Sequence, residues 1–163
     1  MLIEPEHNKY DCDHAEKLRT AIHDFIRRFG LLEPSRTPCG QMLPVTQAHA
    51  LMELRKSPGI THGNLADRLA LSKSTISRMV ARLEAQDRLT QQKDEKDRRI
   101  VRLRLTAKGK RLAQKINDRS LERFIGIIER LPGTMFAQVI ESIDHLNLAT
   151  EKPLDMEKEA PDV

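Results

Sequence analysis

Apolar residues recur at helical spacing near both ends of the chain. Leu18, Ile22, Phe25 and Phe29 fall at i, i+4, i+7 and i+11, which is the pattern of an amphipathic helix. Two later stretches share this property: residues 107–130, with Leu112, Ile116, Leu121, Phe124, Ile125 and Ile128, and residues 134–148, with Phe136, Val139, Ile143 and Leu146. These helices are too apolar on one side to stand alone, so we expect a second copy of the chain to cover them.

Three shorter helices are predicted between these ends, each beginning at a hydroxyl side chain that can cap it. Thr46 opens a helix that ends near Lys56. Thr61 opens a second helix that ends at Leu69, and Ser72 opens a third that ends near Gln86. Serine and threonine are favoured at this position because the side-chain oxygen accepts a hydrogen bond from a free N–H of the first turn.

The hydrophobic period shortens from helical to alternating in the segment "RRIVRLRLT". Val101, Leu103 and Leu105 alternate there with arginines, which is typical of a half-buried strand. Its expected partner is "RLTQQ" at 88–92, and the loop between them, "KDEKDRR", is entirely charged. Helices followed by such a ribbon predict a mainly α (α+β) fold, a winged helix-turn-helix domain with N- and C-terminal dimerisation helices.

The same pattern predicts the domain organisation. We expect a flexible arm at 1–12, dimerisation helices at 13–40 and 107–148, a winged helix-turn-helix DNA-binding domain at 41–106 and a disordered acidic tail at 149–163.

Charge is distributed unevenly along the chain. Residues 68–115 hold 15 lysines and arginines against five acids, a net charge of +10, whereas the remainder has a net charge of −6. A basic block in an otherwise acidic protein predicts a polyanionic partner. Aromatic residues make up only 3% of the chain, which argues against the base-stacking surfaces that bind single-stranded nucleic acid. Double-stranded DNA is therefore the predicted partner.

The helix that opens at Ser72 has an outer face suited to a DNA groove. Ile76, Val80 and Leu83 form its apolar stripe. Hydroxyls and cations occupy the other faces; the predicted DNA-binding residues of this helix are Lys73, Ser74, Thr75, Ser77, Arg78 and Arg82. Small side chains near a helix N-terminus permit close approach to DNA, hydroxyls can donate to phosphates or bases, and arginine can bind guanine through two hydrogen bonds.

The charged loop carries a second DNA-binding prediction. Lys96, Arg98 and Arg99 lie at the tip of the ribbon, where an arginine can enter a minor groove. Asp97 stands among these cations and would be unfavourable near phosphate unless it served another purpose. We expect its carboxylate to orient Arg99 through a charge-assisted hydrogen bond.

These motifs resemble those of the MarR (multiple antibiotic resistance regulator) family of bacterial transcription factors. The segment "DRRIVRLRLTAKG" fits the family pattern D-x-R-x5-L-T-x-x-G, and "NLADRLALSKSTISRMVARLE" precedes it. The resemblance covers about residues 13–148. It implies an obligate homodimer, two winged lobes on a pseudo-palindromic operator, and repression relieved by a ligand or oxidant. It also places Ser74, Thr75, Ser77 and Arg78 on the recognition helix and Arg99 in the minor groove.

The nature of the signal stays open between three alternatives. A small ligand, by resemblance, would bind in a region lined from residues 18–29, 43–52 and 112–124. A redox response would use Cys39 with Cys12; the latter is predicted to precede the first helix, between two carboxylates that disfavour a thiolate. A metal response would use Cys39 with His49, although no tight ligand spacing is present. His23 beside the first apolar stripe is a further candidate.

The predicted class is a regulator and not an enzyme. The sequence has no nucleophile-elbow, P-loop or dinucleotide motif, and no cofactor is expected. The chain has only two cysteines, and none of its apolar runs approaches the roughly 18 residues of a membrane span. We therefore expect a cytoplasmic protein without membrane contact. The alternative class is a winged helix that binds another protein instead of DNA.

Overall fold

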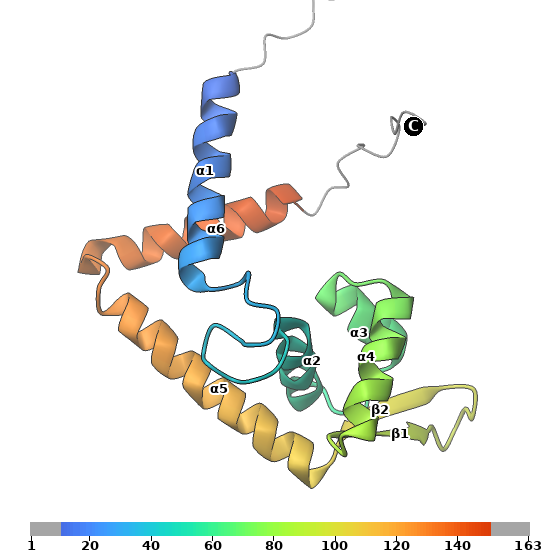
Figure 1. The fold of residues 1–163 in the computed structure, drawn as a ribbon. Coiled ribbons are helices and arrows are strands. Elements are labelled where there is room, and N and C mark those ends of the chain that lie inside the picture. The colour runs from blue at the N-terminus through green and yellow to red at the C-terminus, as the bar shows by residue number, and fades with distance from the viewer. Residues whose placement is uncertain (1–10, 151–163) are drawn as a thin grey trace, which may run out of the picture. The chain divides into compact units, whose positions relative to one another are not determined.

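The computed structural model describes residues 11–150 and confirms a mainly helical chain with one small antiparallel sheet (Figure 1). In chain order the elements are α1 (Cys12–Phe29), α2 (Val45–Lys56), α3 (His62–Leu69), α4 (Lys73–Ala85), β1 (Leu89–Lys93), β2 (Val101–Leu105), α5 (Ala107–Ile128), η1 (Gly133–Met135) and α6 (Phe136–Thr150). The chain forms two compact units that divide after Ser120, within α5. The predicted arm (1–12) and tail (149–163) lie outside the described residues except at their inner ends. There Asp11 caps α1, which begins at Cys12, and Ala149 and Thr150 belong to α6.

The first unit has its core between α2, α3, α4 and the β-hairpin, and α3 packs on both α2 and α4. Apolar residues at helical spacing in α4 meet alternate residues of the strands there. The largest fully buried side chains are Leu51, Leu54, Leu65, Ile76, Val80, Leu83, Leu89 and Leu103. Burying side chains of this size stabilises the fold by roughly 1.5–3 kcal/mol each. The core therefore fixes which face of α4 remains in solvent.

The hairpin pairs Leu89 with Leu105 and Lys93 with Val101. Its second strand also bonds to the loop after α2: the N–H of Gly59 donates to the carbonyl of Leu103 at 2.9 Å, and the N–H of Leu103 donates to Ile60 at 2.9 Å. The hairpin is therefore held to the helical core on one edge.

The beginning of α5 belongs to this core. Thr106 caps the helix, since its hydroxyl accepts from the N–H of Gly109 at 3.0 Å and donates to the carbonyl of Asp87 at 2.8 Å. Ala113 and Ile116 are buried in the same cluster as the residues of α2, α4 and β2. A helix that the sequence assigned to dimerisation thus contributes its first turns to the winged helix-turn-helix core.

Two of the three predicted caps are present in the structure. The hydroxyl of Thr61 accepts from the N–H of Asn64 at 3.2 Å, and that of Ser72 accepts from Thr75 at 3.2 Å. The prediction for Thr46 is wrong, because the N-cap of α2 is Pro44, two residues earlier, and it makes no side-chain cap. Proline already holds φ near the helical value, so the turn can begin directly after it.

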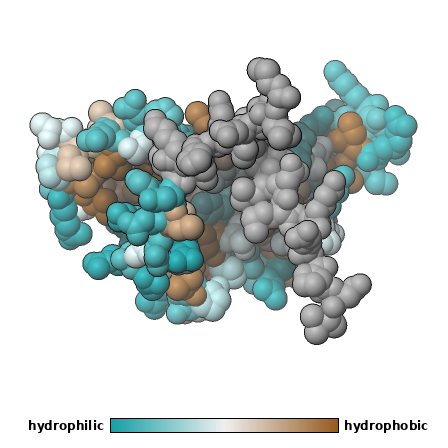
Figure 2. All heavy atoms as spheres, turned by 90° about the horizontal axis from the view of Figure 1, so that it is seen from above, coloured by the Kyte–Doolittle hydropathy of each residue, from teal (hydrophilic) through white to brown (hydrophobic). Residues whose placement is uncertain are grey.

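Helices α1 and α6 bury none of their side chains. The predicted apolar stripe of α1 is open to solvent at Leu18, Ile22 and Phe25. In the second unit, the end of α5 and α6 are exposed at Leu121, Phe124, Ile125, Ile128, Phe136, Ile140, Ile143, Leu146 and Leu148. Figure 2 shows hydrophobic residues (brown) on the surface of the face drawn there. In the range 11–150, no helix has the length and apolar character needed to cross a membrane.

Candidate nucleic-acid interface

Helix α4 separates its apolar and polar residues as the sequence predicts. Ile76, Val80 and Leu83 are fully buried. The outer side is exposed at Lys73, Ser74, Ser77, Arg78 and Arg82. Burial of the apolar stripe against α3 and β1 prevents the helix from rotating. The hydroxyl and cationic side chains are therefore held facing solvent.

Hydroxyl groups cluster at the N-terminus of α4. The Ser72 oxygen lies 3.0 Å from that of Ser74 and 2.9 Å from that of Thr75. Thr75 is half-buried, whereas the other predicted contact residues of α4 are exposed; its hydroxyl, like that of Ser74, has a partner within the helix cap. The N-terminal end of α4 presents positive potential, to which these hydroxyls add hydrogen-bond donors for an anion.

The cations of α4 lack acidic partners. Arg78 donates only to the carbonyl of Ser74, at 3.4 Å, and Lys73 and Arg82 take part in no ion pair within residues 11–150. A solvated structural helix more often neutralises such a row with carboxylates. The charge of this face is therefore available to an external anion.

The wing, residues 93–100, is shaped by Asp94. Its carboxylate accepts from the N–H groups of Lys96 at 3.0 Å and Asp97 at 3.2 Å. The backbone closes the turn, with Asp94 donating to Ile100 at 2.9 Å and Ile100 donating to Asp97 at 2.9 Å. These bonds give the all-charged loop a defined conformation at its base.

Arg102 joins this turn to the core. It donates through Nε to Asp94 and through Nη1 to the carbonyl of Gly59, at 3.1 Å. The Arg102 hydrogen bond is the largest cause that holds the pKa of Asp94 below its ordinary value. The pattern of the sequence indicates no role for Asp94 or Arg102. Only alternation in β2 marked Arg102 as outward-facing, and nothing local indicated its partner in the loop after α2.

Asp97 and Arg99 make the contact that the sequence predicts. The Asp97 carboxylate accepts from the Arg99 backbone N–H, from Nε and from Nη2, each at 3.0 Å. The Arg99 side chain is nevertheless 91% exposed, and its Nη1 group has no partner among residues 11–150. This hydrogen bond is the largest cause of the lowered pKa of Asp97 and the raised pKa of Arg99. A guanidinium held on one edge and open on the other is suited to reach a groove.

The shifts predict how the wing responds to acid. Because the pKa values of Asp94 and Asp97 lie below the ordinary 3.8, their contribution to wing order is present above pH 3.8 and is lost as pH falls through the lowered values. We therefore expect the Arg99 Nε–H resonance to keep its position from pH 8 to pH 5, in NMR spectra, and to move only in stronger acid. An Asp97→Asn variant should show the shifted resonance already at neutral pH. Movement near pH 6 in the native chain would contradict this assignment.

Lys96 and Arg98 complete the wing and are exposed. Neither forms an ion pair with another residue of the described segment. The predicted wing cations thus lie on one turn together with Arg99, and their charge is balanced only in part by Asp97.

The sensor candidates are not brought together. Cys12 is the first residue of α1 and is exposed, so the prediction that it precedes the helix is wrong; Asp11 caps the helix there. Cys39 is half-buried with its sulfur 3.1 Å from the Thr37 hydroxyl. His23 and His49 are both exposed. One copy of residues 11–150 contains no group of three or more His, Cys, Asp or Glu that could hold a metal.

Comparisons with known proteins agree with this fold. The model of the MarR family matches residues 43–101, which include α2, α3, α4 and the wing. The crystal structure of Streptococcus pneumoniae FabT in complex with DNA is similar, with a TM-score of 0.68 at 21% identity over 86% of this chain and 98% of that one.

Two further solved structures have the same fold. Bordetella bronchiseptica BpsR, described with regulation of its DNA binding by 6-hydroxynicotinic acid, has a TM-score of 0.63 at 20% identity, covering 88% of this chain and 98% of its own. The Streptomyces coelicolor PcaV transcriptional regulator has a TM-score of 0.64 at 23% identity, covering 85% and 98%. No curated protein sequence matches the chain significantly.

Proposed function

We propose that the chain is a transcriptional regulator that binds double-stranded DNA, because residues 43–101 match the model of the MarR family. The proposed regulator is a homodimeric cytoplasmic repressor that binds a pseudo-palindromic operator. A small ligand releases it from the DNA. α4 enters a major groove and the wing enters the neighbouring minor groove. The protein acts by binding and has no catalytic step.

One observation carries the proposal. The exposed face of α4 bears hydroxyls and unpaired cations, while its opposite face is fixed in the core. A module that binds another protein would expose apolar anchor residues on such a face. This face instead offers donors and positive charge, which suit phosphates and guanine edges.

Salt dependence of duplex binding tests this function. With a duplex selected from a randomised library, we expect log Kd to change steeply with log salt concentration, because about six or more phosphate contacts release counterions. Arg78→Ala should weaken binding by about 1–3 kcal/mol and relax the preference at one base position. Arg111→Ala, an exposed cation on α5 outside the proposed interface, is the matched control and should change affinity far less.

The opposite outcome favours the alternative class. A shallow salt slope, with Arg78→Ala and Arg111→Ala indistinguishable in fluorescence anisotropy, would support a winged helix that binds protein. That result would contradict the proposal that α4 recognises DNA.

Control by a small molecule is proposed by analogy. In BpsR, 6-hydroxynicotinic acid regulates DNA binding. That ligand is known for BpsR and is not assigned to this chain. For this chain the support is that a fold of this kind can be regulated by a small organic acid. Repression is proposed because an operator-bound dimer blocks access to the DNA that it covers.

A second copy of the chain is proposed to cover the exposed apolar helices. Ile143 on α6 is 46% exposed in a single chain, and the other residues of α6 do not cover its side chain. Ile143→Asp should weaken the dimer at least about 100-fold, because burying an unpaired carboxylate is costly. Sedimentation equilibrium should then show monomers. Ser142→Asp, an adjacent exposed position, is the control and should remain dimeric; a monomeric native protein would refute the dimer.

A further inference from the structure

The carboxylate of Asp94 is largely withdrawn from solvent, although the wing around it is charged. Its side chain is 15% exposed, whereas that of Asp97 is 36% exposed. A carboxylate that loses contact with water requires hydrogen-bond donors in its place. Asp94 accepts from the backbone N–H groups of Lys96 and Asp97, at 3.0 and 3.2 Å, and from the Nε of Arg102. The turn of the wing and strand β2 therefore share one acceptor.

Arg102 extends this contact to the loop between α2 and α3. Its Nη1 donates to the carbonyl of Gly59 at 3.1 Å, 43 positions earlier in the chain. Gly59 is itself fixed, because its N–H donates to the carbonyl of Leu103 at 2.9 Å and its φ of 87° is one that glycine adopts without strain. A planar guanidinium that donates to two segments at once fixes the geometry between them. Arg102 therefore ties the wing turn to the segment that precedes α3.

Beyond the paired strands, the wing tip depends on short-range hydrogen bonds. The ladder between β1 and β2 ends at the pair of Lys93 and Val101. Past this pair, two backbone hydrogen bonds close the turn at Ile100. A two-stranded hairpin is only marginally stable without further packing. The Arg102 side chain is therefore a contact through which the helical core can order the tip.

We infer that Arg102 is a positioning residue for the wing, and that its bonds to Asp94 and Gly59 order the tip in the DNA-free protein. Arg99 is then held in its binding orientation before the duplex arrives, so the loop need not lose conformational freedom during binding. Arg102 acts through Arg99 and makes no contact with DNA itself. The inference rests on the proposed function, in which the wing enters a minor groove.

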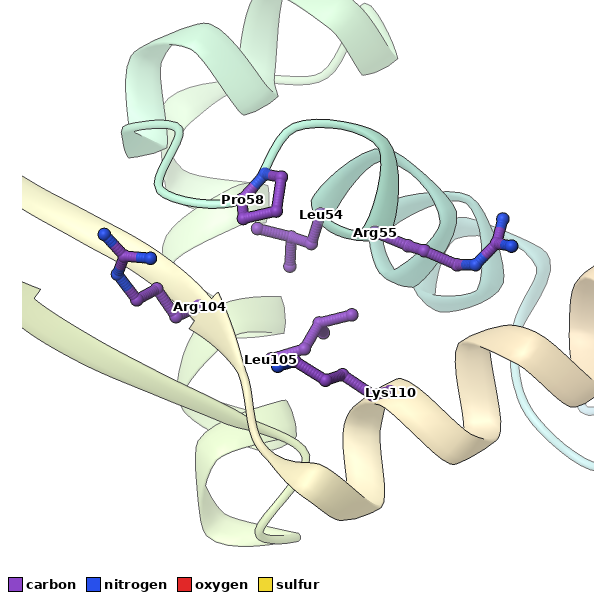
Figure 3. Close-up of a pocket in the computed structure, with 6 residues that line it drawn as sticks. All are labelled: Leu54, Arg55, Pro58, Arg104, Leu105 and Lys110. Atoms are coloured by element: carbon purple, nitrogen blue, oxygen red, sulfur yellow. The ribbon is translucent and has the colours of Figure 1, made fainter.

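Arg104 provides a matched control on the same strand. It lies two positions after Arg102, so both side chains leave the same face of β2. A Cβ atom on Gly59 would lie 3.7 Å from the side chains of both arginines. Arg104 forms no ion pair within residues 11–150, and it lines a pocket of about 300 Å³ together with Pro58 (Figure 3). Replacing Arg104 therefore removes the same charge beside Gly59 without breaking the contact that holds the wing.

Amide exchange in the free protein tests whether Arg102 orders the wing. Arg102→Met removes both donors and keeps an unbranched side chain. We expect the N–H groups of Lys96 and Asp97 to exchange with water at least about tenfold faster in this variant, because their protection depends on the closed turn. Arg104→Met should leave both rates unchanged. The amide of Val80 in α4 reports on the fold and should stay protected in both variants.

Duplex binding tests whether this order matters for function. At fixed salt, Arg102→Met should weaken binding about tenfold. Arg102→Lys keeps the charge but cannot donate to both segments in the same way, so it should recover part of the loss. In the Arg99→Ala background, Arg102→Met should cause no further loss, because the ordering acts through Arg99. In the Arg78→Ala background the effect should remain about tenfold, since α4 binds separately.

Unchanged exchange rates of the wing amides in Arg102→Met would overturn the inference, and so would equal effects of Arg102→Met and Arg104→Met. If exchange accelerates while duplex affinity stays the same, or if the losses from Arg102→Met and Arg99→Ala multiply, Arg102 is not a positioning residue and the proposed function stands. A native chain that binds no duplex would overturn the proposed function and the role of Arg102 in binding. The exchange rates would still decide whether Arg102 orders the wing.

Discussion

Replacing Gly109 with alanine is expected to destabilise the protein by at least about 3 kcal/mol. A Cβ atom at this position would lie 1.9 Å from the carbonyl oxygen of Arg88 and 2.9 Å from its carbonyl carbon. Both obstacles are backbone, so no side chain can turn aside to relieve the clash. The same carbonyl accepts from the N–H of Thr106 at 3.2 Å, so separating the two segments would also break the cap of α5.

The sign of the stability change distinguishes a steric clash at Gly109 from helix propensity. By helix propensity alone, glycine to alanine within a helix should stabilise by about 1 kcal/mol. Gly63→Ala in α3 is the control, because a Cβ there meets only the Thr61 hydroxyl at 3.9 Å; it should be neutral or stabilising. Urea unfolding followed by circular dichroism separates the two. A Gly109→Ala protein as stable as the native one would show that α5 does not approach the backbone of Arg88 this closely.

Replacing Arg99 is expected to lower affinity for duplex DNA by about 1–3 kcal/mol, roughly 5- to 150-fold. Arg99→Ala removes an exposed guanidinium that is already oriented by Asp97. Because an inserted arginine responds to groove width more than to base identity, sequence preference should change less than in Arg78→Ala. Arg99→Lys keeps the charge but loses the two-nitrogen contact, so it should recover only part of the affinity. Fluorescence anisotropy titrations at fixed salt measure each variant.

Replacing Asp97 tests whether the orientation of the Arg99 side chain or only the charge of the wing determines DNA affinity. Asp97→Asn removes a negative charge from the wing and also frees the Arg99 side chain. If orientation matters more, affinity falls although the wing becomes more positive; if affinity rises, the proposed role of Asp97 is wrong. Arg98→Ala is the matched control for Arg99→Ala, because Arg98 is an exposed neighbour without that carboxylate contact. Its loss should be smaller and should decrease as salt is raised.

Sequence alone determined the features that depend on neighbours along the chain. The apolar period of α4 fixed its buried face, and the hydroxyls of Thr61 and Ser72 fixed two helix starts. The Asp97–Arg99 contact was also predictable, because its partners are two residues apart and a wing turn brings them together. Local rules failed at Thr46, where Pro44 allowed the helix to begin earlier than the expected cap.

Tertiary structure alone decided the contacts between residues distant in the sequence. Arg102 bonds to Gly59 across 43 positions, and Gly109 approaches Arg88. No hydrophobic period or capping rule encodes these distances, because each depends on how the hairpin packs against α2 and α5. The sequence therefore determined which side chains face outward, and packing determined which of them are held in place.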